Sequence, residues 1–417
     1  MRTLPLSSSD PEPLFRRPKA PSCEEAVSEI IRKIKEKGDA ALVEYAKKFD
    51  GQKEGYKIRV PKDNIEKSAR KVPKEVLEAL RFAAKNIEEV SRKTKPNDRK
   101  VLAKFANITQ KFVALASVGI YAPGGRAAYT SSVLMCAIPA RVAGVRRVVL
   151  CSPPPVSDAV LAAAYLTGID EVYAVGGAQA IAAMAYGTET VPKVDKIVGP
   201  GNQYVTEAKR QVRGNETDID MLAGPTEVFI VADGSAKANW IAADMIAQLE
   251  HGVDSAAIVI TTNEMAGKTV EELEKQVDDL PRKEIVMQSM KNSTILTTDF
   301  ADFQAVADAI NQYAPEHLEL QTKANGKLLA LVRNAGAVFL GERSCEAFGD
   351  YCAGSNHVLP TGGSSRFSSG LSVSDFMKCI EVVEVKDAKA LVKASAALGR
   401  IEGLEGHARS AERRLGK

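Results

Sequence analysis

The chain has 417 residues, more than one ordinary hydrophobic core accommodates, so two or three domains are expected. Hydrophobic residues make up 45% and charged residues 26%, a mixture typical of folded globular proteins. The 56 basic and 53 acidic side chains leave a net charge of only +3. This excludes a broad positive surface for nucleic acid or anionic lipid and favours a small-molecule substrate.

The first twenty residues combine prolines and charges without a continuous apolar run, and no later stretch approaches eighteen apolar residues. Neither secretion nor membrane spanning is therefore expected. The six cysteines are sparse and contain no C-x-x-C pair, which fits a reducing environment. We expect a cytoplasmic protein.

Two charged amphipathic helices are predicted near the start of the chain, each with one apolar face covering a neighbouring sheet. The apolar positions are Val27, Ile30, Ile31 and Ile34 in the first helix, and Leu80, Ala83, Ile87 and Val90 in the second. From about residue 117, short β-rich runs alternate with Ala-rich helical segments. The strand candidates are VGIYAP, RRVVLCS, EVYAVGG and DKIVGPG, followed by EVFIVAD, SAAIVITT, STILTTD and AGAVFLG up to about residue 340. This alternation predicts parallel βαβ units in two similar α/β domains.

Residues 341–376 are rich in Gly and Ser and too long for an ordinary connection, so this loop is expected to carry function. The following run FMKCIEVVEV predicts a strand, and the Ala-rich tail after it predicts helices. A compact domain has little need of such a polar tail. We therefore expect the tail to reach a second subunit.

The four histidines are His251, His317, His357 and His407, and each lies beside carboxylates, amides or glycines rather than in an apolar run. Taken singly, each is more often a surface or hydrogen-bonded residue than a ligand. Their joint placement beside polar groups makes them the main functional candidates.

The segment AADMIAQLEHG belongs to a helix expected to begin near Ala236. Asp244, Gln248 and His251 fall at i, i+4 and i+7, on one polar stripe of this otherwise apolar helix. The amide oxygen of Gln248 and the imidazole of His251 can bind one ion at this spacing, although a solvent-exposed face is the simpler alternative. The metalloprotease pattern H-E-x-x-H is absent.

In the run YAPEHLEL, Pro315 is expected to end a helix and to hold Glu316 and His317 in a fixed turn. Histidine exchanges protons near neutral pH and glutamate can deprotonate water, so this pair suits general acid and base catalysis. The alternative is a solvated charged turn.

The loop GDYCAGSNHVLPTGG offers Asp350, Asn356 and His357 on a glycine-rich backbone, and the tail segment EGLEGHA offers Glu402 and His407. Asp350 would supply the anionic oxygen that the amide and the imidazole lack. Nitrogen and oxygen donors without thiolates suit zinc or manganese. Alone, the tail segment would be an ordinary exposed helix.

The dinucleotide motif G-x-G-x-x-G is absent, because GPGNQY at Gly199 to Tyr204 lacks the third glycine. Still, YAPGGRAAY, AVGGAQA and VGPGN each follow a predicted strand and precede a predicted helix. These loops are therefore expected along the carboxyl edge of one sheet, where α/β folds bind ligands.

The blocks VGIYAPGG, GGAQAIAA, GPGNQYV, AGPTEV, AQLEHG, APEHLEL, GDYCAGSNHVLPTGG and EGLEGHA together resemble the histidinol dehydrogenase family, from about residue 25 to 410. The resemblance implies oxidation of L-histidinol through L-histidinaldehyde to L-histidine with two NAD, the final step of histidine biosynthesis. It also implies a homodimer that exchanges its C-terminal tails and binds one zinc ion per subunit.

The resemblance also assigns roles to residues of this chain. It implies that Glu316 and His317 are catalytic, His317 removing the hydroxyl proton and Glu316 activating water. The implied zinc ligands are Gln248, His251, Asp350 and His407, the last from the partner's tail. The implied substrate contacts are Thr226, Gln248, His251, His317, Asp350, His357, Glu402 and His407, with Tyr121, Gln179 and Asn202 binding NAD. For His357, contact with the substrate imidazole and support of a neighbouring ligand both stay open.

The expected fold class is therefore α/β, with two Rossmann-like domains built on parallel sheets and a helical C-terminal tail exchanged in a dimer. The expected domains are an N-terminal arm (1–24), a catalytic zinc domain (25–118 with 227–371), an incomplete Rossmann-like NAD domain (119–226) and the dimerisation tail (372–417).

Three alternatives stay open. A related member of the family could oxidise another amino alcohol or a sulfonate alcohol. Cys345 and Cys352 flank Asp350, so an aldehyde dehydrogenase with a cysteine nucleophile is a second reading. A sugar- or polyol-binding α/β protein without chemistry is the third, although the Glu316–His317 pair would have no purpose there.

Overall fold

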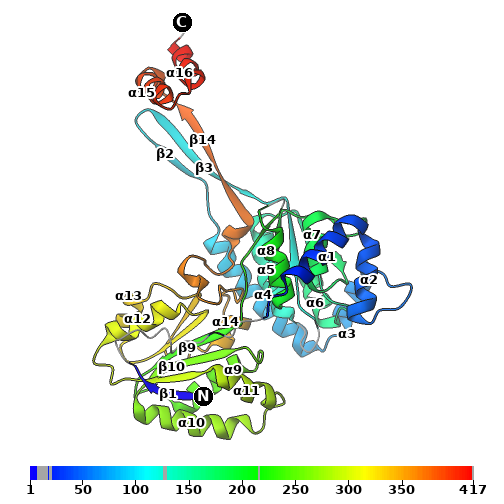
Figure 1. The fold of residues 1–417 in the computed structure, drawn as a ribbon, viewed down its shortest axis with the longest axis vertical. Helices are drawn as coiled ribbons and strands as arrows, with labels where there is room; N and C mark the ends of the chain where they lie inside the picture. Colours follow the sequence, from blue (N-terminus) through cyan, green and yellow to red (C-terminus); the bar gives the residue numbers. More distant parts are fainter. Residues whose placement is uncertain (7–16, 18–20, 125–128, 215–216, 416–417) are drawn as a thin grey trace.

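The computed structural model describes residues 1–6, 17, 21–124, 129–214 and 217–415. It consists of two α/β bodies and an arm that projects from them and ends in two helices (Figure 1). The first body is built on a five-stranded sheet and the second on a six-stranded sheet, both parallel throughout. The α/β class with parallel sheets is as predicted. None of the helices in the described ranges is long and apolar enough to cross a membrane.

The five-stranded sheet contains the first four predicted strand segments. Its strands are β4 (Ser117–Tyr121), β5 (Arg147–Cys151), β6 (Glu171–Tyr173), β7 (Lys196–Val198) and β8 (Asp218–Ile219). They are ordered β6-β5-β4-β7-β8, so the connections reverse direction between β4 and β7. Such a reversal creates a crevice at the carboxyl ends of the strands. The glycine-rich loops after β4, β6 and β7 lie at this edge, as expected.

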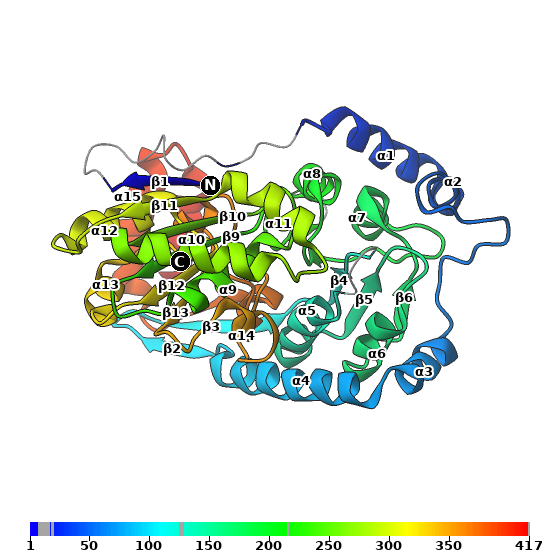
Figure 2. The same ribbon diagram turned by 90° about the horizontal axis from the view of Figure 1, so that it is seen from below.

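Helices cover both faces of this sheet (Figure 2). One face carries α3 (Lys62–Lys71), α4 (Lys74–Thr94), α5 (Thr130–Ala143) and α6 (Asp158–Leu166). The other carries α1 (Glu24–Lys37), α2 (Asp39–Asp50), α7 (Gly177–Tyr186) and α8 (Gln203–Val212). Residues 24–94 thus share their core with the five-stranded sheet, whereas the predicted grouping placed 25–118 with 227–371.

The predicted apolar faces of the first helices are largely buried. All four residues predicted in α1 are buried, as are Leu80, Ala83 and Ile87 in α4. Val90 is 40% exposed, and Ser91 is buried instead, so that part of the prediction was wrong. The apolar stripe of α4 continues at i+4 from Ile87, and the last turn therefore presents Ser91 to the core.

The six-stranded sheet contains the other predicted strands. Its members are β1 (Arg2–Pro5), β9 (Glu227–Ala232), β10 (Ala256–Thr261), β11 (Thr294–Thr297), β12 (His317–Gln321) and β13 (Ala337–Leu340), in the order β1-β11-β10-β9-β12-β13. The helices α9 (Ala238–Leu249), α10 (Asn263–Val277) and α11 (Lys283–Ser289) cover one face, and α12 (Phe303–Tyr313) and α13 (Asn325–Leu331) cover the other. The strands β1 and β12 were not predicted, because their sequences lack a continuous apolar run.

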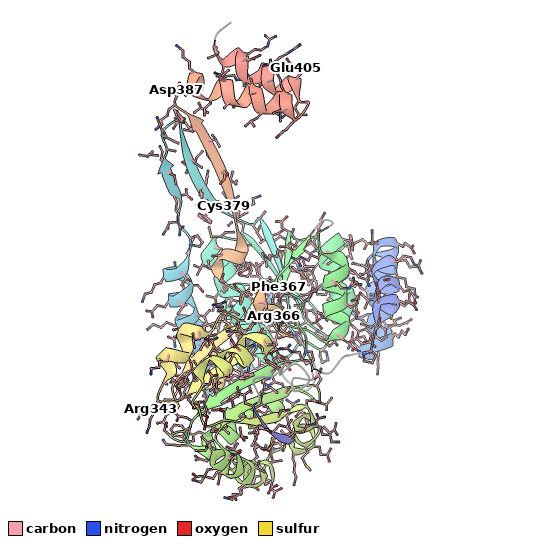
Figure 3. All side chains as sticks on the ribbon, turned by 60° about the vertical axis from the view of Figure 1, so that its left-hand side comes forward. Arg343, Arg366, Phe367, Cys379, Asp387 and Glu405 are labelled. Carbon is pink, nitrogen blue, oxygen red and sulfur yellow. The ribbon has the colours of Figure 1, made fainter. Side chains whose placement is uncertain are left out.

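The arm is a three-stranded antiparallel sheet that carries the C-terminal helices at its far end (Figures 1 and 3). It consists of β2 (Arg99–Leu102), β3 (Ala106–Ala114), β14 (Met377–Val385), α15 (Ala388–Ile401) and α16 (Glu405–Glu412). The predicted strand and helical tail are confirmed. Large apolar side chains are exposed in the single chain at Val383 (59%) and Ile401 (86%).

The predicted functional loop, residues 341–376, is partly ordered into short elements. It contains the helix α14 (Glu346–Tyr351) and two 3-10 turns, Ser364–Arg366 and Val373–Phe376. The helix α14 brings carboxylates of this segment to the edge of the six-stranded sheet.

Candidate active site

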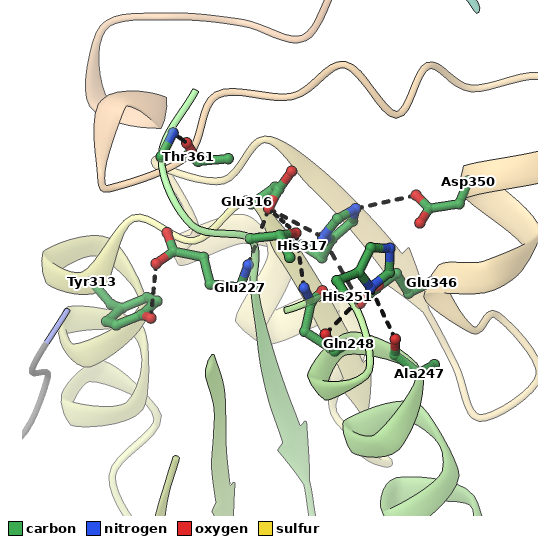
Figure 4. A network of polar contacts seen from close by, with 12 residues as sticks. Glu227, Ala247, Gln248, His251, Tyr313, Glu316, His317, Glu346, Asp350 and Thr361 are labelled. Atoms are coloured by element: carbon green, nitrogen blue, oxygen red, sulfur yellow. Dashed lines mark hydrogen bonds and ion pairs between the residues drawn. The ribbon is translucent and has the colours of Figure 1, made fainter. Parts of the chain in front are cut away.

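Several sequence-predicted residues converge where the strands of the six-stranded sheet begin (Figure 4). Thr226 directly precedes β9, Glu316 directly precedes β12, and His317 is the first residue of β12. Gln248 lies in the last turn of α9, and α14 approaches from the loop after β13. The site therefore lies at the amino ends of β9 and β12, whereas ligands of open parallel sheets usually bind at the carboxyl ends. His317 belongs to a strand and not to the predicted turn.

His317 is buried among carboxylates. Its Nε2 lies 3.3 Å from Oδ1 of Asp350, and its Nδ1 lies 3.8 Å from both Glu316 Oε2 and Glu346 Oε2. Burial alone lowers the pKa of His317, but the negative charges of Glu346, Glu316 and Asp350 together raise it well above its ordinary value. Neither ring nitrogen has hydrogen-bond geometry with another described group, so the 3.3 Å approach of Nε2 to Asp350 is the closest polar contact of the ring.

Glu316 is held by two donors. Its Oε2 accepts hydrogen bonds from Thr226 Oγ1 (2.5 Å) and from the backbone N–H of Glu227 (3.0 Å). Burial raises the pKa of Glu316 to about 7, although the positive charge of His317 and both hydrogen bonds act in the opposite direction. A carboxyl group with a pKa near neutrality can both accept and release a proton under physiological conditions.

Glu346 is a member of this site that the sequence reading missed. It is 1% exposed, and burial, with the negative charge of Asp350, raises its pKa to about 8 despite the positive charge of His317. Glu346 and Asp350 are four residues apart on α14, so they share one helix face. That i, i+4 pair of carboxylates was the available signal in the sequence.

The amide of Gln248 links Thr226 to Glu346. As placed, its Nε2 donates to Thr226 Oγ1 (2.8 Å). With the amide turned over, Nε2 would donate to both oxygens of Glu346 (2.8 and 2.9 Å) and Oε1 would accept from Thr226. Gln248 is completely buried and Asp244 is partly buried, whereas His251 is exposed. The predicted polar stripe therefore runs from the interior at Gln248 to the surface at His251.

Asp350 and His251 supply further donors to the same region. Burial acts to raise the pKa of Asp350, but the close contact with His317 and the positive charge of that ring hold the pKa below its usual value. His251 lies two residues beyond the end of α9, and its Nδ1 donates to the carbonyl oxygen of Ala247 (3.0 Å). The Nε2 lone pair of His251 is then directed away from the helix.

His357 contacts the same segment of chain. Its Nδ1 lies 2.8 Å from the backbone oxygen of Asp350, and its Nε2 lies 3.1 Å from Ser132 Oγ. Burial lowers the pKa of His357, which favours the neutral ring.

The two predicted site residues of the tail lie elsewhere within one chain. Glu402 follows α15 and His407 lies in α16, and both are exposed at the far end of the arm (Figure 1). A single chain therefore does not bring them to His317. Their predicted roles depend on a second copy.

The predicted NAD residues lie together at the carboxyl edge of the five-stranded sheet. Tyr121 ends β4 and its hydroxyl accepts from Gly177 N (3.0 Å), Gln179 is buried in the first turn of α7, and Asn202 caps α8. A Cβ on Gly199 would lie 2.2 Å from the Tyr121 carbonyl oxygen. Only glycine permits this close approach of the loops after β4 and β7, and the N-termini of α7 and α8 lie at the same edge of the sheet.

The environment of Cys345 does not favour the hypothesis of a cysteine nucleophile. Burial raises the pKa of the Cys345 thiol, with smaller contributions from Asp244 and Glu319. A nucleophilic cysteine requires the opposite shift.

A buried histidine among carboxylates with shifted pKa values, on an α/β fold, is the arrangement typical of an enzyme that transfers protons. The family model described as histidinol dehydrogenase matches residues 16–415. The chain belongs to the histidinol dehydrogenase family.

Individual relatives agree with this assignment. The chain is 44% identical to a histidinol dehydrogenase of Mesorhizobium japonicum over 99% of both chains. It is 46% identical to one of Thermus thermophilus, over 94% of this chain and 95% of the relative. The crystal structure of histidinol dehydrogenase from Elizabethkingia anophelis superposes with a TM-score of 0.95 at 38% identity, covering 100% of this chain and 98% of that chain. The resemblance predicted from the sequence motifs, and with it the class of oxidoreductases, is therefore confirmed.

Proposed function

We propose that this chain oxidises L-histidinol to L-histidine through L-histidinaldehyde, using zinc and two NAD, as the final step of histidine biosynthesis. The relatives named above support the reaction. The observation that carries the proposal within the structure is the buried pair of Glu316 and His317, whose pKa values are both raised.

His317 would accept the proton of the carbinol hydroxyl while the carbon is oxidised. Glu316 would then take a proton from water, which adds to the aldehyde carbon and gives the hydrate. His317 would accept a hydroxyl proton again in the second oxidation. NAD supplies the hydride acceptor in each of the two oxidations, and Tyr121, Gln179 and Asn202 would bind it.

For zinc we assign Gln248, His251 and Asp350 of one chain and His407 of the partner subunit. The donor chemistry fits, because Nδ1 of His251 is engaged by a backbone carbonyl and Nε2 keeps its lone pair, as in most histidine ligands. The carboxyl end of α9 also favours a cation. A bound zinc ion would act as a Lewis acid that holds the substrate's imidazole and amine nitrogens.

A different trio could also hold a cation, since donor atoms of His317, Glu346 and Asp350 all lie within 4.8 Å of one another. We prefer the first set because His317 is needed as a base. Neutralising Asp350 with a cation would also remove one charge that raises the pKa of His317, so more of the ring would be in the neutral form that can accept a proton.

Tail exchange completes the proposal. The arm leaves exposed apolar side chains, and a surface hollow of about 620 Å³ lined by Val385, Leu391 and His407 lies between β14, α15 and α16. A second copy would cover this surface and bring His407 and Glu402 to the site, where Glu402, Thr226 and the ligands would contact the substrate. A large apolar interface is typical of permanent homodimers.

The test is NAD reduction with L-histidinol, measured before and after complete metal chelation and again after zinc is returned. Activity that is lost and then restored supports the proposal, and activity unchanged by metal removal contradicts it. Parallel assays with other amino alcohols and sulfonate alcohols identify a related substrate. Unchanged turnover after Cys345 and Cys352 are both replaced by Ser excludes a cysteine nucleophile.

A further inference from the structure

Both ring nitrogens of His357 are engaged within the chain. A carbonyl oxygen only accepts, so Nδ1 of His357 must donate to the backbone oxygen of Asp350 at 2.8 Å. In the neutral ring Nε2 is then an acceptor, and the hydroxyl of Ser132 donates to it at 3.1 Å. The ring therefore connects two protein groups and has no nitrogen left for a substrate.

The group at the far side of this ring belongs to the other body. Ser132 is buried in the first turn of α5, which packs on the five-stranded sheet. The neighbouring side chain strengthens the connection, because Asn356 Nδ2 donates to the backbone oxygen of Met135 on the same helix (2.7 Å). The loop after α14 is thus attached to α5 at two successive residues.

Asp350 is placed by this attachment. It lies in the last turn of α14, a helix of only six residues, whose own hydrogen bonds fix its end weakly. The carboxylate of Asp350 must nevertheless stay 3.3 Å from Nε2 of His317. The hydrogen bond from His357 to the Asp350 backbone supplies the missing constraint.

We propose that His357 is a positioning residue, which fixes the Asp350 carboxylate by joining the backbone of Asp350 to Ser132 of α5. It acts through Asp350 and does not bind substrate through its nitrogens. The proposal rests on the proposed function only where Asp350 is taken as a zinc ligand. Removing partners that orient metal ligands typically weakens metal binding by about 10- to 100-fold.

The experiment replaces His357 with Asn or with Gln. Each of these amides can place a nitrogen near the position of only one of the two ring nitrogens. In His357→Asn the amide nitrogen can occupy the place of Nδ1 and keep the bond to Asp350. In His357→Gln the amide lies near the place of Nε2, and the bond to Asp350 is lost. Ser132→Ala removes the link to α5, and Ser131→Ala in the same helix turn is the matched control.

Zinc affinity is measured on the metal-free full-length protein by competition with a zinc indicator, and unfolding midpoints show that each variant is folded. We expect zinc affinity to fall about 10- to 100-fold in His357→Gln and about tenfold in Ser132→Ala. His357→Asn keeps the donor to Asp350 but loses the contact with Ser132, so its zinc affinity should fall about tenfold, as in Ser132→Ala. Ser131→Ala should stay within about threefold of the parent. In steady state, kcat should fall more than KM rises in His357→Gln, because misplaced catalytic geometry affects the reacting complex.

Two results would overturn the proposal. One is a His357→Gln variant with parental zinc affinity and only a raised KM for L-histidinol, which indicates a substrate contact. The other is parental zinc affinity in both Ser132→Ala and His357→Asn, which shows that the contact with Ser132 does not position Asp350.

Asp350→Asn separates this proposal from the proposed function. If it leaves zinc affinity unchanged, the metal assignment fails. The ¹⁵N imidazole signal of His317 in the metal-free protein then tests whether His357 positions Asp350. A displaced Asp350 should change that signal in His357→Gln and in Ser132→Ala. An unchanged signal in both variants contradicts the positioning role of His357.

Discussion

The hydroxyl of Thr226 lies 2.5 Å from Oε2 of Glu316, although the two residues are 90 positions apart in the chain. A hydroxyl has one proton to donate, and Thr226 also lies 2.8 Å from the amide of Gln248. If Thr226 donates to an ionised Glu316, it must accept from Nε2 of Gln248, whose oxygen then faces Glu346. An ionised Glu316 therefore accompanies a protonated Glu346. With the Gln248 amide turned over, Gln248 donates to an ionised Glu346 and accepts from Thr226, and Glu316 is then the protonated carboxyl group.

Replacing Glu316 with Gln should slow aldehyde oxidation more than alcohol oxidation. The amide keeps the size of the side chain but cannot take a proton from water, and loss of a general base typically costs about 10²- to 10⁴-fold. The two half-reactions are measured separately with L-histidinol and L-histidinaldehyde. Equal loss in both would contradict the assigned role. Thr226→Ser keeps the donor to Glu316 and serves as a control near parental activity.

The rate of aldehyde oxidation should depend on pH through Glu316. Burial raises the pKa of this carboxyl to about 7, and a base must be ionised, so the rate should fall about tenfold per pH unit below that value. In Glu316→Gln the residual rate should lose this dependence. A pH profile of single-turnover aldehyde oxidation checks both statements, and an acidic limb that survives in the variant would assign the titration to another group.

Glu346→Gln should change the proton affinity of His317 without unfolding the protein. Glu346 is the strongest of the charges that raise the pKa of His317, and a neighbouring opposite charge shifts a pKa by about 1 to 3 units. Removing that charge should lower the pKa of His317 and move the acidic limb of alcohol oxidation to lower pH. The control is Glu342→Gln, at a partly exposed carboxylate that pairs with Lys237. An acidic limb that does not move in Glu346→Gln would show that Glu346 does not act on His317.

Tail exchange predicts complementation between two inactive variants. His407→Asn and Asp350→Asn should each be inactive as homodimers. When the two are unfolded together and refolded at equal amounts, about half of the dimers combine both chains, and each of these contains one intact site. Activity should then return to about a quarter of the parental value. Without exchange every site stays defective, and the mixture would stay inactive.

The buried ion pair of Lys209 and Asp220 should stabilise the glycine-rich loop after β7. The pair is 2.7 Å apart with both side chains at most 3% exposed, and its members bind the backbone of Gly199. Lys209→Met leaves a buried charge unpaired, which typically costs about 3–5 kcal/mol of unfolding free energy. Denaturant unfolding measures the loss, and Asp220→Asn in the same chain should recover part of it.

A surface pair provides the comparison. Lys62 lies 3.2 Å from Asp170, and their side chains are 76% and 55% exposed. Solvent screens this pair, so Lys62→Met should cost less than about 1 kcal/mol. A similar cost for both lysine variants would mean that burial of the Lys209 pair does not matter.

Local patterns in the sequence determined much of the fold. The alternation of β-rich runs with Ala-rich segments predicted most strands of both parallel sheets, because burial on both faces gives a strand a continuous apolar run. The rare His side chains and their acidic neighbours, in YAPEHLEL and in the loop around Asp350, predicted acid–base chemistry and a metal. These signals come from residues that lie close together in the sequence, so they can be recognised without the three-dimensional structure.

Only the tertiary structure decided how distant segments meet. The run HLELQ is polar at alternate positions, yet it is fully buried as β12 because its carboxylate and amide pair with Asp244 and Glu346. Residues 24–94 cover the five-stranded sheet, Glu346 enters the site, and Ser132 reaches His357 across 225 positions. Such pairings depend on where two elements come together in space, and the periodicity of one segment does not identify the segment that it contacts.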